Sequence, residues 1–258
     1  MPTCSRFLAL AMLCAVFATP AAAKCGAAVP GVLFGGCVNE LTAGLALVPE
    51  GGVVPQARAA GTHVTVTGAY TSGEKREPEG LYILRGEALD PHPQGWDGVA
   101  LIDGRGRLTL HHAARVDVAN ERFNLRRKAS RIAFAKAAKR RGWSAFQSHM
   151  LVIDGKVDTK PRDGAPRFAR RLLYVLEDGG VGLFETPPVT LHDAAILIED
   201  ALSPVMALNL DMGSYDYCRI EREGGARSCG TLAPEQTGKL SNLLILSRAE
   251  AGDLVAVE

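Results

Sequence analysis

Residues 190–214, TLHDAAILIEDALSPVMALNLDMGS, hold the helix and strand signals that decide the fold. Thr190 is positioned to cap a helix, and Asp193 follows as an acidic residue in its first turn. Apolar residues then recur at helical spacing on the expected buried side, at Leu191, Ala194, Ala195, Ile198 and Leu202. Because Pro204 ends the helix, residues 205–210 are predicted to form a buried strand with Asp211 at its end.

Strand patterns dominate much of the remaining chain. Residues 62–67 alternate polar and apolar side chains, and residues 98–102 and 107–111 flank a glycine-rich turn, as in a hairpin. Further strands are expected at residues 80–84, 150–153, 172–176 and 240–246. The sequence therefore predicts an α+β fold with a mixed β-sheet and a few packed helices. Because no internal repeat or long linker divides it, residues 24–258 are expected to form one domain.

A basic helix is predicted at residues 121–141, with Asn120 capping its start and Gly142 its end. Its apolar stripe comprises Leu125, Ala129, Ile132, Ala133 and Ala137. Nine of the 21 residues from Arg122 to Gly142 are Lys or Arg. This pattern is typical of a solvated helix face. Alternatively, residues 122–141 contact an anionic surface, such as an envelope polymer or a phosphate-bearing glycan.

The composition excludes several classes of protein. The chain has 258 residues, of which 47% are apolar, so it is neither disordered nor collagen-like. The 29 Lys and Arg residues against 28 Asp and Glu give a formal charge of +1, which argues against a nucleic-acid partner. The sequence contains no phosphate loop, HExxH helix or GxSxG nucleophile elbow, and no cofactor or metal is expected.

The N-terminal residues have the layout of a secretory signal peptide. Arg6 supplies positive charge, an apolar run follows, and Pro20 precedes three alanines that suit signal peptidase. A transmembrane anchor is the alternative, but the apolar run is much shorter than the roughly 20 residues needed to span a bilayer. We therefore expect residues 1–23 to be a signal peptide, the mature chain to have no membrane span, and the protein to be periplasmic or secreted.

Four cysteines remain after removal of the signal peptide, an even number that suits an oxidising compartment. They allow three connectivities. The pairing Cys25–Cys37 with Cys218–Cys229 is favoured, and pairing between the two ends of the chain is the alternative. The spacings within the two close pairs match no familiar zinc motif.

Three polar or glycine-containing stretches coincide with strand ends. In Thr67-Gly-Ala-Tyr70, the small Gly68 allows backbone to approach a ligand, and Tyr70 can stack on a sugar face. Gln147, Ser148 and His149 are polar residues that enter an apolar strand, where burial requires hydrogen-bond partners. Each of these stretches is also compatible with an ordinary turn or a structural hydrogen-bond cluster.

The third stretch, Asn209-Leu-Asp-Met-Gly-Ser214, presents a carboxylate at the end of a buried strand, a common way to place an acid in a cleft. Alternatively, Asp211 has a structural role and caps a loop. Arg170 and Arg171 begin another strand, so one of the two can reach a phosphate while the other faces solvent.

In this order the stretches resemble the phosphodiester glycosidase family, bacterial relatives of the enzyme that uncovers mannose 6-phosphate. The family's glycine turn and Pro-x-Gly-Leu-Tyr match residues 67–70 and 78–82, its Gln-Ser-Gly-Pro-x-Leu-Val matches residues 147–155, and its Ala-Leu-Asn-Leu-Asp-Gly-Gly-x-Ser matches residues 207–214. The resemblance covers roughly residues 60–248. Four positions depart from the family pattern: Thr67, His149, Met150 and Met212. Leu172 is a fifth if Arg171 matches the arginine of the family's Arg-Thr-Ala strand.

The resemblance implies a secreted or periplasmic glycosidase that cleaves a sugar from a phosphodiester-linked glycan or glycolipid. The expected catalytic residues are Asp211 as carboxylate, Arg171 as phosphate ligand, His149 as acid, and Ser148. The expected substrate-binding residues are Gln147, Asn209, Gly213, Ser214, Tyr70 and Gly68. The departures leave an alternative, a catalytically inactive envelope glycan-binding protein on the same fold.

Overall fold

The computed structural model describes residue 25, residues 28–49, 51–52 and 54, and residues 61–248. The expected signal peptide lies outside the described residues. Two α-helices and many short strands give an α+β fold, which confirms the predicted class. Within the part of the chain that the structure describes, no helix is long and apolar enough to cross a membrane.

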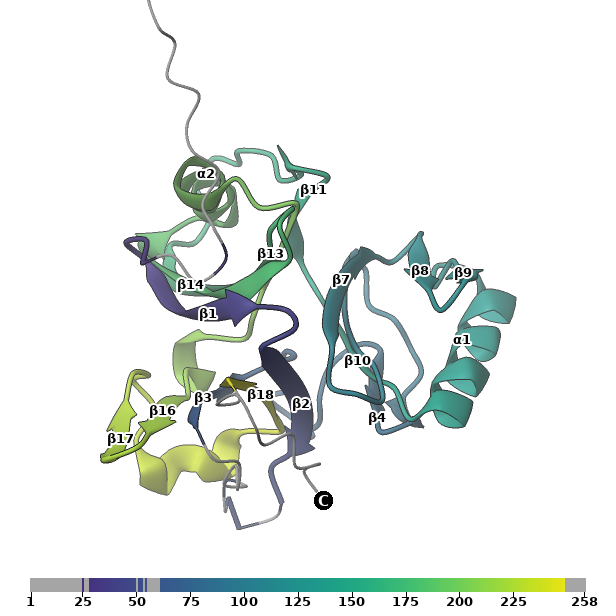
Figure 1. Cartoon of the computed structure of the whole chain (residues 1–258), viewed down its shortest axis with the longest axis horizontal. Coiled ribbons are helices and arrows are strands. Elements are labelled where there is room, and N and C mark those ends of the chain that lie inside the picture. The colour runs from purple at the N-terminus through teal and green to yellow at the C-terminus, as the bar shows by residue number, and fades with distance from the viewer. Residues whose placement is uncertain (1–24, 26–27, 50, 53, 55–60, 249–258) are drawn as a thin grey trace, which may run out of the picture.

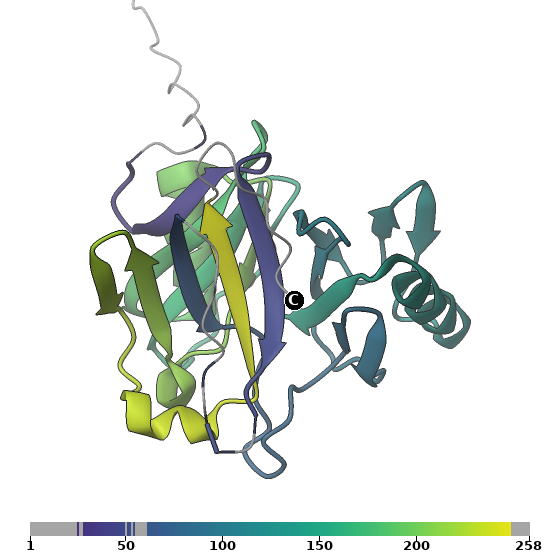
Figure 2. The same ribbon diagram turned by 60° about the horizontal axis from the view of Figure 1, so that its bottom comes forward.

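Two sheets pack face to face and form the main core (Figures 1 and 2). The first, six-stranded, has the order β1 (Val32–Cys37), β14 (Gly180–Val189), β13 (Phe168–Val175), β15 (Met206–Asn209), β11 (Met150–Ile153) and β12 (Lys156–Val157). The second, five-stranded, has the order β17 (Gly225–Ser228), β16 (Cys218–Arg222), β3 (Thr62–Thr67), β18 (Asn242–Arg248) and β2 (Leu41–Leu47). Leu173, Val64 and Leu244 are among the buried side chains between them.

A third sheet lies beside this pair, on the right in Figure 1, with the order β5 (Glu87–Asp90), β4 (Tyr82–Leu84), β10 (Ser144–Ser148), β6 (Gly98–Ile102) and β7 (Leu108–His112). It packs on helix α1 (Lys128–Arg141) and on the hairpin of β8 (Val116–Val118) and β9 (Glu121–Phe123). Only His149 separates β10 from β11, so the chain crosses from the third sheet to the first at this residue.

The segment 190–210 folds as its sequence predicts. Helix α2 (Leu191–Leu202) begins at Thr190, whose side chain accepts a hydrogen bond from the Asp193 N–H, and it buries Ala194, Ala195 and Ile198. Strand β15 follows, and Asp211 lies two residues beyond its last residue. Two features of the fold differ from expectation: the relative direction of the paired strands and the start of the first helix.

Every strand pairing among the described residues is antiparallel, and the strands divide among several sheets rather than forming one mixed sheet. The unit β14–α2–β15 has the order from which parallel neighbours would be expected. However, β13 lies between β14 and β15 and pairs with both in the antiparallel sense. The helix therefore connects strands that are not adjacent.

The basic helix is shorter than predicted. It begins at Lys128 rather than at residue 121, because residues 121–123 form β9 and Asn120 turns the hairpin with a φ of 64° instead of capping a helix. Its buried residues are Phe134, Ala137 and Ala138, whereas Ile132 is 48% exposed. The expected end at Gly142 is confirmed, with a left-handed φ of 66°.

Both predicted disulfides are present. Cys25–Cys37 closes the start of the described chain with a Cα–Cα distance of 5.1 Å, and Cys218–Cys229 closes the β16–β17 hairpin with 4.8 Å. Each joins residues close in sequence, as the favoured connectivity required.

Candidate functional site

Three strand ends meet at one place and bring together most of the predicted site residues. The backbone N–H of Asp211, after β15, donates to the carbonyl of Gly68, after β3, at 3.1 Å. The N–H of Asn209 donates to the carbonyl of His149, between β10 and β11, at 2.9 Å. Backbone pairing thus fixes the loop after β3, the sheet crossover and the end of β15 relative to one another.

The Asp211 side chain is buried, with 5% of its surface exposed. Burial raises its pKa to about 7, although hydrogen bonds from the backbone N–H groups of Thr71 and Met212 act in the opposite direction. The Thr71 N–H donates to Asp211 Oδ2 at 3.0 Å. A carboxyl group with a pKa near neutrality exchanges protons readily at neutral pH, as a general acid or base requires.

A short hydrogen-bond chain joins the predicted residues next to Asp211. Ser148 is fully buried and its hydroxyl donates to the carbonyl of Asn209 at 2.5 Å. The Asn209 side-chain amide donates to Tyr70 Oη at 2.6 Å and to the Leu210 carbonyl at 2.9 Å. Burial raises the Tyr70 pKa, so this phenol stays protonated at neutral pH. Ser148 and Asn209 thus hold Tyr70 in place.

Three aromatic rings form a partly exposed cluster around this chain. The ring centroids of Tyr70 and Trp96 are 4.7 Å apart, those of Tyr70 and His149 5.8 Å, and those of Trp96 and His149 5.6 Å. Burial lowers the His149 pKa, and Arg170 acts in the same direction. His149 is therefore a neutral imidazole at neutral pH, which disfavours the expected role as a cationic acid. The ring faces suit contact with a sugar.

Gln147 lies beneath the aromatic cluster and supports the loop that carries Trp96. Its side-chain oxygen accepts from the N–H of Gln94 at 2.9 Å and from that of Leu81 at 3.3 Å. Its amide group donates to the carbonyls of Gln94 and Trp96. The side-chain oxygen and amide group of Gln147 therefore both bond to backbone groups of the chain.

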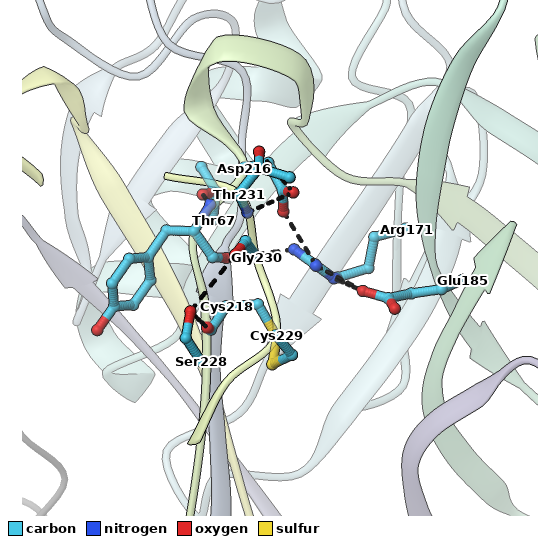
Figure 3. The surroundings of a disulfide bond; sticks show 10 residues. Thr67, Arg171, Glu185, Asp216, Cys218, Ser228, Cys229, Gly230 and Thr231 are labelled. Atoms are coloured by element: carbon cyan, nitrogen blue, oxygen red, sulfur yellow. Dashed lines mark hydrogen bonds and ion pairs between the residues drawn. A yellow bond between two sulfur atoms is a disulfide. The ribbon is translucent and has the colours of Figure 1, made fainter. Parts of the chain in front are cut away.

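The two neighbouring arginines face opposite sides of β13, as alternation along a strand requires. Arg171, the expected phosphate ligand, is fully buried against structural partners: it pairs with Glu185 at 2.5 Å and with Asp216 at 3.0 Å, and donates to the Tyr217 carbonyl at 3.2 Å. Figure 3 shows this network beside the Cys218–Cys229 disulfide.

Arg170, in contrast, is the arginine on the side of the aromatic cluster. It is partly exposed, interacts electrostatically with Tyr70 and His149, and burial lowers its pKa. Its Nε is buried without a hydrogen-bond partner among the described residues. The sequence predicted Arg171 as the phosphate ligand, whereas Arg170 is the arginine that interacts with Tyr70 and His149 of the aromatic cluster.

Gly68 is packed closely against Asn242. A Cβ at this position would lie 2.8 Å from Asn242 Oδ1, which accepts the Ala69 N–H at 2.8 Å while Asn242 Nδ2 donates to the Ala69 carbonyl at 3.0 Å. The other two predicted residues, Gly213 and Ser214, begin a short 3-10 turn after Asp211 and are both exposed.

Sequence reasoning missed Trp96 and Thr71, and it assigned no site role to Asn242. Trp96 follows a run of Pro, Gln and Gly that signals only a loop, and the contacts that bring it to the site come from Gln147, far along the chain. Asn242 stands at the start of β18, and a polar residue at the head of an apolar strand was the available signal.

No family model matches the sequence, and no curated protein does. Comparison of structures finds similarity at the level of the fold to the catalytic domain of a phosphodiester glycosidase. One similar structure is the catalytic domain of zebrafish N-acetylglucosamine-1-phosphodiester alpha-N-acetylglucosaminidase, auto-inhibited by its pro-peptide, with a TM-score of 0.50, 13% identity, and coverage of 83% of this chain and 74% of that one. A hypothetical protein from Synechocystis gives a TM-score of 0.49 at 11% identity, over 81% of this chain and 57% of that one. At such identities the likeness shows the fold alone.

Proposed function

We propose that this chain is a secreted or periplasmic glycosidase that releases a sugar from a phosphodiester-linked glycan or glycolipid. The observation that carries the proposal is the buried Asp211 carboxyl, with a pKa of about 7, beside the Tyr70–Trp96–His149 cluster. The similar fold of a catalytic domain that acts on a sugar phosphodiester supports the same reading. The two disulfides suit an oxidising compartment.

In the proposed reaction, the bond between the anomeric carbon and the phosphate oxygen breaks. The Asp211 carboxylate removes a proton from water, the water oxygen bonds to the anomeric carbon, and the phosphate leaves with the bonding electrons as a phosphomonoester. Because positive charge develops on the sugar, a nearby carboxylate also stabilises the transition state.

Arg170 replaces Arg171 as the proposed phosphate ligand. Its guanidinium can donate two parallel hydrogen bonds to phosphate oxygens, and its unpaired Nε supports this role. Tyr70 and Trp96 contact the sugar ring, and neutral His149 donates or accepts a hydrogen bond beside them. Ser148, Asn209 and Gln147 hold these side chains in position.

Sugar release from a matched pair of substrates tests the reaction class. We expect release from an aryl glycosyl phosphodiester or a UDP-sugar, and at least tenfold less from the aryl glycoside that lacks the phosphate. Arg170→Gln should raise KM for the phosphodiester by about tenfold. Arg105→Gln, at an exposed arginine in the turn between β6 and β7, serves as the matched control. Binding of these compounds without sugar release would contradict catalysis and favour the glycan-binding alternative.

Residues 122–141 are proposed to contact an anionic polymer of the envelope. Lys128, Lys136, Lys139 and Arg140 are exposed on α1, and the segment contains no acidic residue. Charge complementarity supports the proposal, although Arg122 and Arg141 already pair with Asp117 and Glu121. Substitution of the four exposed residues by glutamine should weaken binding to such a polymer without changing turnover.

A further inference from the structure

A cavity of about 310 Å³ lies at the other end of the sheet pair from the candidate site. Its lining comes from both sheets and from the chain before β1: Ala28, Val32, Leu33, Phe34, Gly35, Thr62, Tyr174, Ile220, Arg222, Arg227 and Arg248. Thr62 begins β3, whereas the candidate site begins beyond Thr67 at the end of the same strand. A six-residue strand spans roughly 17–20 Å, so the two places are separate.

Three arginines reach this cavity because of strand register. Arg227 on β17 is paired with Ile220 on β16, and Arg222 lies two residues further along β16, so both share the face of buried Ile220. Arg248 on β18 is paired with Thr62. Neighbouring strands therefore direct three guanidinium groups toward one space between the sheets.

The arginine cavity, defined by Arg222, Arg227 and Arg248, has an excess of positive charge. Among the described residues, its lining contains no Asp or Glu. Glu221, between Ile220 and Arg222, lies on the opposite face of β16 and pairs with His63 at 2.9 Å and with Arg219 at 2.6 Å. Among the described residues, neither Arg222 nor Arg227 has an ion pair or a side-chain hydrogen bond.

One side of the cavity is pre-organised and the other is apolar. The Arg248 guanidinium donates to the Gly35 carbonyl and stacks over the Phe34 ring, 5.8 Å from its centroid. Burial raises the pKa of Tyr174 to about 12, so its hydroxyl remains a proton donor. Val32, Phe34 and Ile220 supply apolar surface for the body of a ligand.

We propose that the arginine cavity binds a small organic phosphate monoester. Three guanidinium groups without a carboxylate suit a dianion better than a monoanion, and planar guanidinium groups match phosphate oxygens in geometry. The apolar residues favour an organic substituent over inorganic phosphate alone, and the volume is at the lower end for ligand pockets. This site is independent of the proposed glycosidase reaction.

Calorimetric titration of the full chain with phenyl phosphate tests the proposal. We expect saturable binding that weakens about tenfold or more in Arg222→Gln and in Arg227→Gln. Arg105→Gln is the matched control, because this exposed arginine lies in the turn between β6 and β7, which contributes nothing to the cavity. Binding should weaken with added salt, and benzoate, a monoanion with the same ring, should bind at least tenfold more weakly.

Three results would overturn the proposal. The first is that the full chain does not bind phenyl phosphate. Binding by a chain truncated after Arg248 would not rescue the proposal. The second is binding lost in Arg170→Gln but retained in Arg222→Gln, which would assign the ligand to the candidate active site. The third is equal affinity for benzoate. Sugar release by the Arg222→Gln variant should equal that of the wild type, so failure of this inference is distinguishable from failure of the proposed function.

Discussion

Asp211→Asn should make the protein more stable at alkaline pH than the wild type. The folded state holds the pKa of this carboxyl at about 7, against 3.8 in an ordinary environment, because the side chain is buried. The folded state therefore keeps a proton that the unfolded state releases, and wild-type stability falls as pH rises through this interval. Asparagine resembles the neutral carboxyl and still accepts the Thr71 N–H, so it avoids this loss.

The magnitude follows from the two pKa values. Raising the pH from about 5 to about 8 lowers the wild-type free energy of unfolding by the equivalent of about two pKa units, or about 2.5 kcal/mol. Urea unfolding at both pH values measures this change for the wild type, Asp211→Asn and the exposed control Asp200→Asn. The difference between Asp211→Asn and the wild type should shift by about 2.5 kcal/mol toward the variant, and Asp200→Asn should follow the wild type. A parallel pH dependence in all three proteins would refute the reasoning.

Three further changes test the supports of the site by urea unfolding. Arg171→Met leaves Asp216 and Glu185 without their buried cation and should lower the free energy of unfolding by about 3 kcal/mol. Arg170→Met should change it by less than about 1 kcal/mol. Equal losses in the two variants would contradict the assignment of the two arginines. Asn242→Ala leaves the buried Ala69 N–H and carbonyl unpaired and should cost about 3 kcal/mol as well as turnover; unchanged turnover would mean that the turn after β3 does not depend on this clasp. Replacement of both Cys218 and Cys229 by alanine opens a loop with a sequence separation of 11 and should cost about 3 kcal/mol, and a loss below about 1 kcal/mol would count against a structural role for the disulfide.

Local signals explain what the sequence predicted correctly. Thr190 and Pro204 mark the ends of α2 regardless of the rest of the chain, and the strand that follows ends at Asn209, two residues before Asp211. The disulfides were predictable because each pair is close in sequence and a short loop brings its members together.

Long-range pairing explains what the sequence did not determine. Alternation along a strand places Arg170 and Arg171 on opposite faces, but only the packing of β16 and its preceding loop against β13 decides which face carries the Asp216 partner. Residues 121–123 form a strand because residues 116–118 pair with them, and helix periodicity alone contains no information on that hairpin. The hydrogen bonds between Gln147 and the loop that carries Trp96 likewise join residues about fifty positions apart in the sequence.

Sugar release by the wild type and by Asp211→Asn is the most direct test of the central claim, that the strand-end cluster around Asp211 is a catalytic site. Both proteins are assayed with the same glycosyl phosphodiester across the pH range around 7, beside Asp200→Asn as control. We expect wild-type turnover to rise with pH through about 7, as Asp211 ionises. Asp211→Asn should lose at least a hundredfold in kcat at every pH. Turnover by Asp211→Asn equal to that of the wild type would show that Asp211 is not a catalytic residue.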